Sequence, residues 1–142
     1  MDKPDEEQEE RKVILAVDDM GLNLRTIKLT LEDSFRVLLA KTGDMALTLT
    51  KVEQIDLILL DIEMPGMSGF DFMQRLKTDI TVNEIPPVIF VTAHATPELL
   101  YKAKLAGACG YVVKPFDPEV LRQKVNDVLG LSKTLEDGFV TE

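Results

Sequence analysis

The sequence predicts one α/β domain in which helices cover both faces of a parallel sheet. Five short apolar runs of strand length, rich in Val, Ile and Leu, recur along the 142 residues: Val13 to Val17, Arg36 to Ala40, Leu57 to Leu60, Val88 to Val91, and Gly110 to Val113. Most of these runs are apolar at successive residues, which is typical of strands buried on both faces. Helix-like segments separate them, so that strand and helix alternate five times.

Apolar spacing and end signals predict the helices. Apolar residues recur three or four positions apart in three segments: Leu24, Ile27 and Leu31; Met73 and Leu76; and Leu121, Val125 and Val128. Asp117 followed by Pro118 is typical of a helix start, and Thr96 followed by Pro97 is the same signal. Gly107 is expected to end the helix that begins at Pro97, because glycine adopts a left-handed conformation at low cost.

Charge and cysteine content exclude several classes of protein. The formal net charge is -9, of which the first ten residues contribute -5 and the remainder -4. No basic stripe or long apolar run is present, so binding to nucleic acid and insertion into a membrane are not expected. Cys109 is the single cysteine, so that no internal disulfide forms and a cytoplasmic location is the default. It is expected to pack as a small hydrophobic residue.

Three segments are predicted from this composition. Residues 1–11 form an acidic flexible tail, because blocks of like charge repel one another and stay extended. Residues 12–130 form the domain. Residues 131–142 are too few for a second domain and are expected to be a short C-terminal extension or the start of a linker.

Polar side chains follow four of the five apolar runs. Asp18 and Asp19 follow the first run, Asp61 the third, Thr92 the fourth and Lys114 the fifth. In open α/β sheets, ligands bind beyond the carboxyl ends of the strands. These residues are therefore expected to meet at one edge of the sheet.

A cluster of three carboxylates must take up a proton or bind a cation, because each like-charge pair at about 4 Å costs roughly 4 kcal/mol at an effective dielectric near 20. Oxygen ligands of this kind suit Mg²⁺, which completes its shell with water and phosphate oxygens. Taken singly, Asp18 or Asp19 could cap a helix and Asp61 could open a turn. Thr92 could be an ordinary strand residue, and Lys114 an ordinary solvated lysine. Their joint occurrence favours a site that holds a phosphoryl group on a carboxylate.

The motifs at these strand ends resemble those of the receiver domains of two-component response regulators. The resemblance covers roughly residues 12 to 130, and its four motifs occur in the order of the family: Val17-Asp18-Asp19, Leu60-Asp61-Ile62-Glu63-Met64-Pro65-Gly66-Met67-Ser68-Gly69, Val91-Thr92-Ala93, and Lys114-Pro115-Phe116. It implies a flavodoxin-like five-stranded parallel sheet of order 2-1-3-4-5 with helices on both faces.

The resemblance also implies residue roles. Asp61 would be the phosphoacceptor, phosphorylated by a sensor histidine kinase or a histidine phosphotransfer protein. Asp19, Asp61 and the backbone carbonyl of Glu63 would bind Mg²⁺, or Mn²⁺ in its place, and Asp18 would act through a bound water. Lys114 would pair with Asp61 and then with the phosphoryl oxygens, and its peptide bond to Pro115 is expected to be cis.

Signal output is implied by the same resemblance. Thr92 would move toward the phosphoryl group while Tyr111 turns inward, which changes the surface made by the helix after Thr96, the strand Gly110 to Val113 and the helix after Asp117. That surface would signal to a downstream partner or output domain, or form a homodimer. Glu63 and His94 would flank the water that hydrolyses the acyl phosphate and so set its lifetime. Beyond its own phosphorylation and dephosphorylation, the domain is not expected to be an enzyme.

Three alternatives are retained. A degenerate receiver would act only as a phosphorylation-independent interaction module. A phosphatase of the haloacid-dehalogenase type needs a second Asp two residues after the nucleophile, where this chain has Glu63. A flavodoxin-like FMN carrier needs a hydroxyl- and glycine-rich loop after the first strand, where this chain has Asp18 and Asp19.

Overall fold

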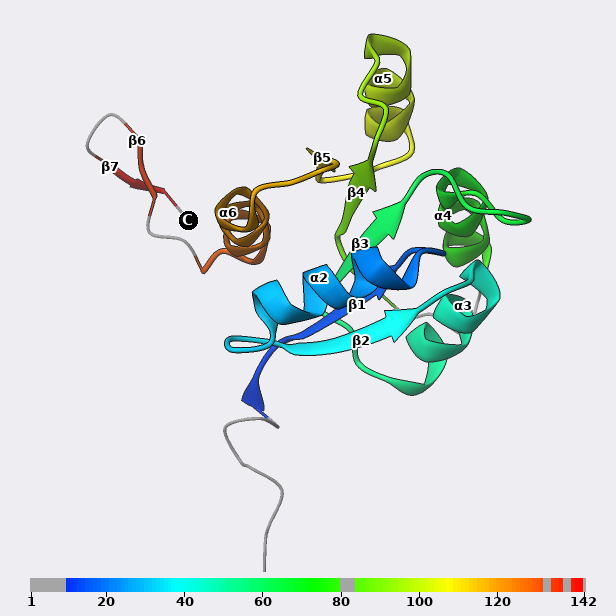
Figure 1. Cartoon of the computed structure of the whole chain (residues 1–142), viewed down its shortest axis with the longest axis horizontal. Helices are drawn as coiled ribbons and strands as arrows, with labels where there is room; N and C mark the ends of the chain where they lie inside the picture. Colours follow the sequence, from blue (N-terminus) through cyan, green and yellow to red (C-terminus); the bar gives the residue numbers. More distant parts are fainter. Residues whose placement is uncertain (1–9, 80–83, 132–133, 137–138, 142) are drawn as a thin grey trace, which may run out of the picture.

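Five parallel strands form the central sheet of the domain (Figure 1). The computed structural model describes residues 10–79, 84–131, 134–136 and 139–141. The strands are β1 (Val13–Val17), β2 (Arg36–Ala40), β3 (Leu57–Asp61), β4 (Val88–Thr92) and β5 (Gly110–Val113). Their order is β2-β1-β3-β4-β5, which confirms the predicted fold class. The third and fourth strands each extend one residue beyond the predicted run.

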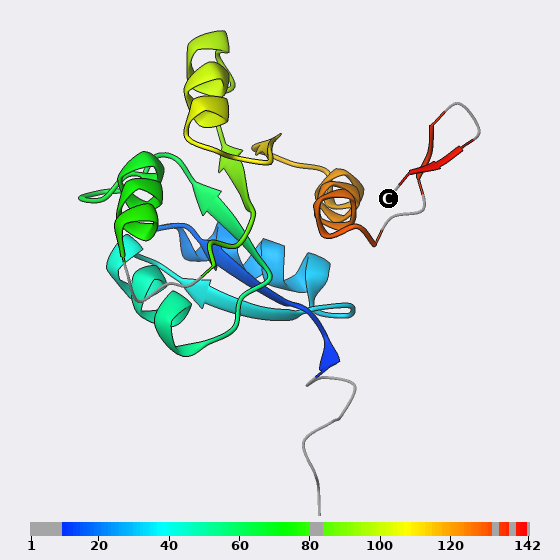
Figure 2. The same ribbon diagram turned by 180° about the vertical axis from the view of Figure 1, so that it is seen from behind.

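Helices cover both faces of this sheet (Figure 2). They are α2 (Gly21–Leu31), α3 (Gly43–Val52), α4 (Gly69–Thr78), α5 (Pro97–Leu105) and α6 (Pro118–Leu129). The buried side chains of α2 and α6 share one core cluster, and those of α3, α4 and α5 share the other. The predicted alternation of strand and helix is therefore confirmed.

The predicted end signals lie at the ends of the helices. Asp117 is the N-cap of α6 and Thr96 the N-cap of α5, and a proline follows each of them. Gly107 has a φ of 99° just after the end of α5, a conformation that suits glycine. Helix α4 begins with a capping box, in which Ser68 and Asp71 exchange backbone and side-chain hydrogen bonds.

Burial differs between the centre and the edges of the sheet. Strands β1, β3 and β4 are buried at every residue, as their continuous apolar runs predict. In the edge strand β5 only Val112 is buried. Cys109, which directly precedes this strand, is exposed. The expectation that it packs inside is wrong, because an edge strand with one buried residue leaves its flanks outside the core.

Two of the predicted segments flank the domain in the sequence. The predicted acidic tail falls, for residues 1–9, outside the described residues. In the predicted C-terminal extension, β6 (Thr134–Glu136) pairs antiparallel with β7 (Phe139–Thr141). Among the described residues, no helix is long and apolar enough to cross a membrane.

Candidate functional site

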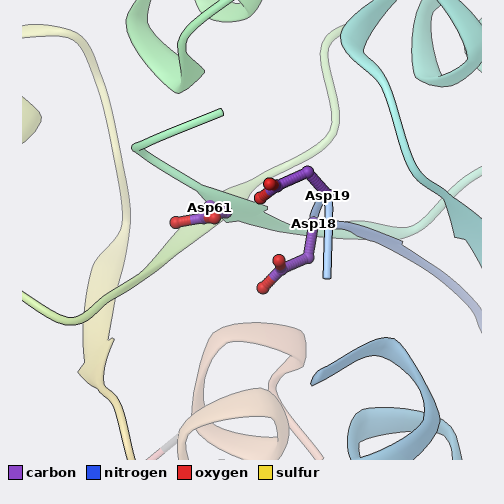
Figure 3. A group of neighbouring side chains, drawn as sticks. All are labelled: Asp18, Asp19 and Asp61. Carbon is purple, nitrogen blue, oxygen red and sulfur yellow. The ribbon is translucent and has the colours of Figure 1, made fainter. Parts of the chain in front are cut away.

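The ends of β1 and β3 bring three carboxylates together (Figure 3). The register pairs Val17 with Leu60, so the residues that follow them, Asp18 and Asp61, lie side by side. Asp19 comes next along the chain. One carboxylate oxygen from each aspartate lies within 4.8 Å of the others. The predicted convergence of these side chains is present.

The three aspartates differ in exposure. Asp18 is 1% exposed and Asp61 is 5% exposed, whereas Asp19 is exposed to solvent. The Asp18 carboxylate accepts a hydrogen bond from the backbone N–H of Met20 at 2.9 Å. Met20, and neither aspartate, is the N-cap of α2. Asp18 is therefore held by the turn between β1 and α2 and does not cap the helix.

Lys114 joins the carboxylates from the end of β5. Its Nζ donates to Oδ2 of Asp18 at 2.7 Å and lies 3.4 Å from Oδ2 of Asp61. The expected pairing with Asp61 is present, and sequence reasoning missed the closer contact with Asp18. The Lys114–Pro115 peptide bond is cis, as predicted.

Burial opposes the charge on Lys114, but its two partners outweigh that effect. Desolvation alone would lower the pKa of Lys114, whereas the hydrogen bond to Asp18 and the charges of Asp61 and Asp18 raise it. The net result is a raised pKa, so that Lys114 is a firmly protonated cation within the site.

The surroundings of Asp61 disfavour the ionised form of its carboxylate. Burial and the neighbouring charge of Asp18 raise its pKa from 3.8 to about 6, against the opposing effects of Lys114 and of a hydrogen bond from the Glu63 backbone. That N–H donates to Oδ1 of Asp61 at 3.2 Å. A cation bound between the aspartates would relieve the repulsion that causes this shift.

Thr92 and Tyr111 lie on the neighbouring strands β4 and β5. Thr92 is fully buried, and its hydroxyl accepts a hydrogen bond from the backbone N–H of His94 at 3.0 Å and donates to the His94 carbonyl at 3.2 Å. Tyr111 is 43% exposed. In this structure, the Thr92 hydroxyl is thus engaged by the loop after β4, and Tyr111 faces outward.

Glu63 and His94 meet at the mouth of the site. Nδ1 of His94 contacts Oε1 of Glu63, and both side chains are more than half exposed. The motifs predicted that these residues flank the site, and the structure places them in direct contact. No pattern in the sequence gave that contact, because it joins two loops from different strands.

Gly69 is a structural requirement of the site that sequence reasoning did not identify. Its backbone N–H donates to the Ile62 carbonyl at 2.8 Å. A Cβ atom at this position would lie 2.6 Å from the backbone oxygen of Asp61 and 3.0 Å from the ring of Phe90. The available signal was a glycine directly after the capping residue Ser68, at the end of the Asp61 motif.

The donor set fits a divalent cation. Three carboxylate groups whose oxygens converge, two of them buried, are the hard ligands that Mg²⁺ and Mn²⁺ take. Lys114 supplies a further positive charge at the same edge. The arrangement can therefore neutralise a group with several negatively charged oxygens beside the nucleophilic carboxylate of Asp61.

Comparison with known proteins agrees with this geometry. Residues 14–126 match the family described as the response regulator receiver domain. The chain is 36% identical over 117 residues to the chemotaxis protein CheY of Pseudomonas aeruginosa, an alignment that covers 81% of this chain and 94% of CheY.

Solved structures of receiver domains share the fold. Chemotaxis protein CheY4 of Vibrio cholerae superposes with a TM-score of 0.77 at 32% identity, covering 83% of this chain and 98% of CheY4. The BeF3-activated receiver domain of DrrB, from Thermotoga maritima, gives a TM-score of 0.74 at 30% identity, covering 84% of this chain and 98% of that domain.

The chain belongs to the response regulator receiver family, and its domain is of the CheY type. Receiver domains are in general signalling domains and not enzymes. They bind Mg²⁺ at an acidic site and interact with kinases and output domains.

Proposed function

We propose that Asp61 accepts a phosphoryl group from a sensor histidine kinase or a histidine phosphotransfer protein in a Mg²⁺-dependent reaction. The observation that carries this proposal is the placement of Asp61, a 5% exposed carboxylate within reach of two further aspartates and Lys114. A pKa of about 6 leaves Asp61 mostly ionised at neutral pH, and therefore nucleophilic, even without a cation.

The chemistry transfers one phosphoryl group between two side chains. An oxygen of Asp61 forms a bond to phosphorus while the bond from phosphorus to the donor's imidazole nitrogen breaks, and that nitrogen keeps the electron pair. Lys114 then shifts its hydrogen bonds from the free carboxylates to the phosphoryl oxygens. Its raised pKa supports this role, because it stays charged throughout.

The metal would be held by the aspartate cluster. We assign Asp19, Asp61 and the backbone carbonyl of Glu63 as direct ligands and Asp18 as a ligand through water. The 2.7 Å contact of Asp18 with Lys114 supports that division, because it occupies one oxygen of this carboxylate. When bound, Mg²⁺, or Mn²⁺ in its place, would neutralise negative charge on the phosphoryl oxygens.

Phosphorylation would shift the domain between two states. Thr92 would release the His94 backbone and hydrogen-bond the phosphoryl group, and Tyr111 would turn inward. The surface of α5, β5 and α6, called here the signalling face, would change as a result. It would bind a downstream partner or output domain, or form a homodimer.

Glu63 and His94 would set the lifetime of the aspartyl phosphate. Their exposed contact joins the loop after Asp61 to the loop after Thr92, and a hydrolysing water would approach Asp61 beside it. Self-catalysed hydrolysis of this kind would be the sole turnover of the domain, which acts on no other substrate. It would do so in the cytoplasm, without binding nucleic acid or membrane.

Intact mass spectrometry tests the proposal directly. Incubation with acetyl phosphate and Mg²⁺ should add one phosphoryl group to the wild-type chain, and neither Asp61→Asn nor the wild type with excess EDTA should gain it. Asp33→Asn, in the turn after α2, is the matched control and should behave as wild type. A wild-type mass that stays unchanged would favour a phosphorylation-independent interaction module, and steady release of phosphate from small phosphate esters would favour a phosphatase.

A further inference from the structure

Helix α5 is weakly anchored to the core. Ala103 is its one buried residue, whereas α2 and α4 each bury four. Two of its large apolar side chains, Tyr101 and Leu105, are about two-thirds exposed. With so little apolar surface buried, the position of α5 depends on a few peripheral contacts.

Two of these contacts are made by lysines and join α5 to α4. The Nζ of Lys102 in α5 lies 4.4 Å from the centroid of the Phe70 ring at the start of α4. At the other end of α4, the Nζ of Lys77 donates to the carbonyl of Ala106, which directly follows α5. Both ends of α4 are therefore tied to the C-terminal end of α5, at Lys102 and Ala106.

Phe70 connects the contacts between α4 and α5 to the strand ends where the site residues lie. Its ring packs against Phe90 of β4, with centroids 5.3 Å apart. The residue before it, Gly69, is so close to the backbone of Asp61 that a Cβ there would lie 2.6 Å from the Asp61 carbonyl oxygen and 3.0 Å from the Phe90 ring. A shift in the loop after Asp61 must therefore move Phe70, and with it the surface on which Lys102 rests.

We propose that Phe70 and Lys102 are positioning residues that couple the Asp61 site to α5, and that their contact holds the domain in the state described here. The inference rests on the proposed function, because the coupling acts when Asp61 is phosphorylated. A ligand that favours a second state must overcome whatever stabilises the first. Weakening the contact therefore eases the response of α5 and leaves the chemistry at Asp61 in place.

Backbone hydrogen exchange in α5 tests the contact in the unmodified 142-residue chain. Lys102→Met keeps the aliphatic stem and removes the cation, and we expect α5 amides to exchange about 2- to 5-fold faster, the range for an exposed cation–π contact. Lys104→Met makes the same change of charge on the same helix. In the described part of the chain the cation–π contact is made by Lys102 and not by Lys104, so Lys104→Met should leave exchange unchanged. Lys102→Arg keeps the cation and should restore the wild-type rate.

Titration with beryllofluoride and Mg²⁺ tests the coupling. Lys102→Met and Phe70→Leu should each raise the apparent affinity about 2- to 5-fold, because a larger fraction of molecules already occupies the second state. The double variant should gain no more than either single variant, since both remove the same contact. Equal effects of Lys102→Met and Lys104→Met, or additive effects in the double variant, would overturn the inference. A wild-type chain that does not respond to beryllofluoride would overturn the proposed function instead. The exchange rates would still show whether the contact between Phe70 and Lys102 stabilises α5.

Discussion

Two parts of the carboxyl edge of the sheet are built differently. At the ends of β1 and β3, Asp18 and Asp61 are almost completely buried, and Lys114 contacts both. In the part of the chain that the structure describes, every buried side-chain nitrogen or oxygen has a hydrogen-bond partner. One strand further, α5 buries a single residue, and Tyr111 of β5 is 43% exposed.

Under the proposed function, this difference separates a part with fixed chemistry from a part with an adjustable position. Carboxylates that must receive a group in one geometry gain from burial and from several partners, because both restrict their positions. A helix that must report the event gains from shallow burial, because small energies then change its position. Substitutions in either part test this comparison.

The largest expected effect concerns the charge in the buried part. Lys114→Met should slow phosphoryl incorporation from acetyl phosphate by on the order of 10²-fold, because the phosphoryl oxygens lose a charged donor. Rates are compared by intact mass at fixed Mg²⁺. Lys41→Met removes an exposed lysine at the end of β2 and should leave the rate unchanged. Equal rates in wild type and Lys114→Met would mean that Lys114 has no part in the transfer.

Gly69 tests how tightly the site is packed. Gly69→Ala should lower the free energy of unfolding by roughly 2–3 kcal/mol, because its Cβ would lie 2.6 Å from the Asp61 oxygen and 2.9 Å from Cα of Ile62. Gly66→Ala is the control. A Cβ atom at position 66 has no neighbour within 4 Å, so the variant bears only the strain of a φ of 79°, about 1 kcal/mol. Urea unfolding should show this difference. Equal losses of unfolding free energy in the two variants would mean that the loop moves to accommodate the Cβ atom.

A smaller effect follows from the raised pKa of Asp61. The folded state binds this proton more tightly than the unfolded chain, so the stability that Asp61 contributes is present below about pH 4 and is lost as the pH rises through about 6. Without metal, Asp61→Asn should therefore be more stable than wild type at pH 7.5, by roughly 1–3 kcal/mol, where the upper value corresponds to the full pKa shift, and nearly equal at pH 4.

Urea unfolding in EDTA at both pH values measures this effect. Mg²⁺ should stabilise the wild type at pH 7.5 and reduce the advantage of the variant, because a bound cation offsets the repulsion. An Asn variant that is less stable than wild type at pH 7.5 without metal would contradict the assigned origin of the shift.

The smallest expected effect lies at the exposed mouth of the site. Glu63→Ala and His94→Ala should each change the decay rate of the aspartyl phosphate by roughly 2- to 5-fold, the range expected from one exposed polar contact. Decay is followed by the loss of the phosphorylated mass after removal of acetyl phosphate. Unchanged lifetimes in both variants would exclude a role for this pair.

The sequence predicted the buried part of the molecule better than the exposed part. Continuous apolar runs predicted β1, β3 and β4, and the polar residues after them predicted the cluster of Asp18, Asp19 and Asp61. These signals are strong because burial on both faces and convergence at one edge of a sheet restrict which residues are tolerated.

The missed features depend on three-dimensional contact. The Lys114–Asp18 hydrogen bond and the Glu63–His94 contact join residues from separate strands. The exposure of Cys109 follows from the position of β5 at the edge of the sheet, which an apolar run does not reveal. Local pattern carries little information about any of these.

Under the proposed function, Asp61 is the input of the domain and the signalling face is its output. Amide spectra of the full-length chain, recorded with Mg²⁺ before and after addition of beryllofluoride, test it most directly. We expect large changes around Asp61, Thr92 and Tyr111 and along α5, small changes in α2 and α3, and no response from Asp61→Asn. Identical responses in wild type and Asp61→Asn, or changes spread evenly over all helices, would contradict it.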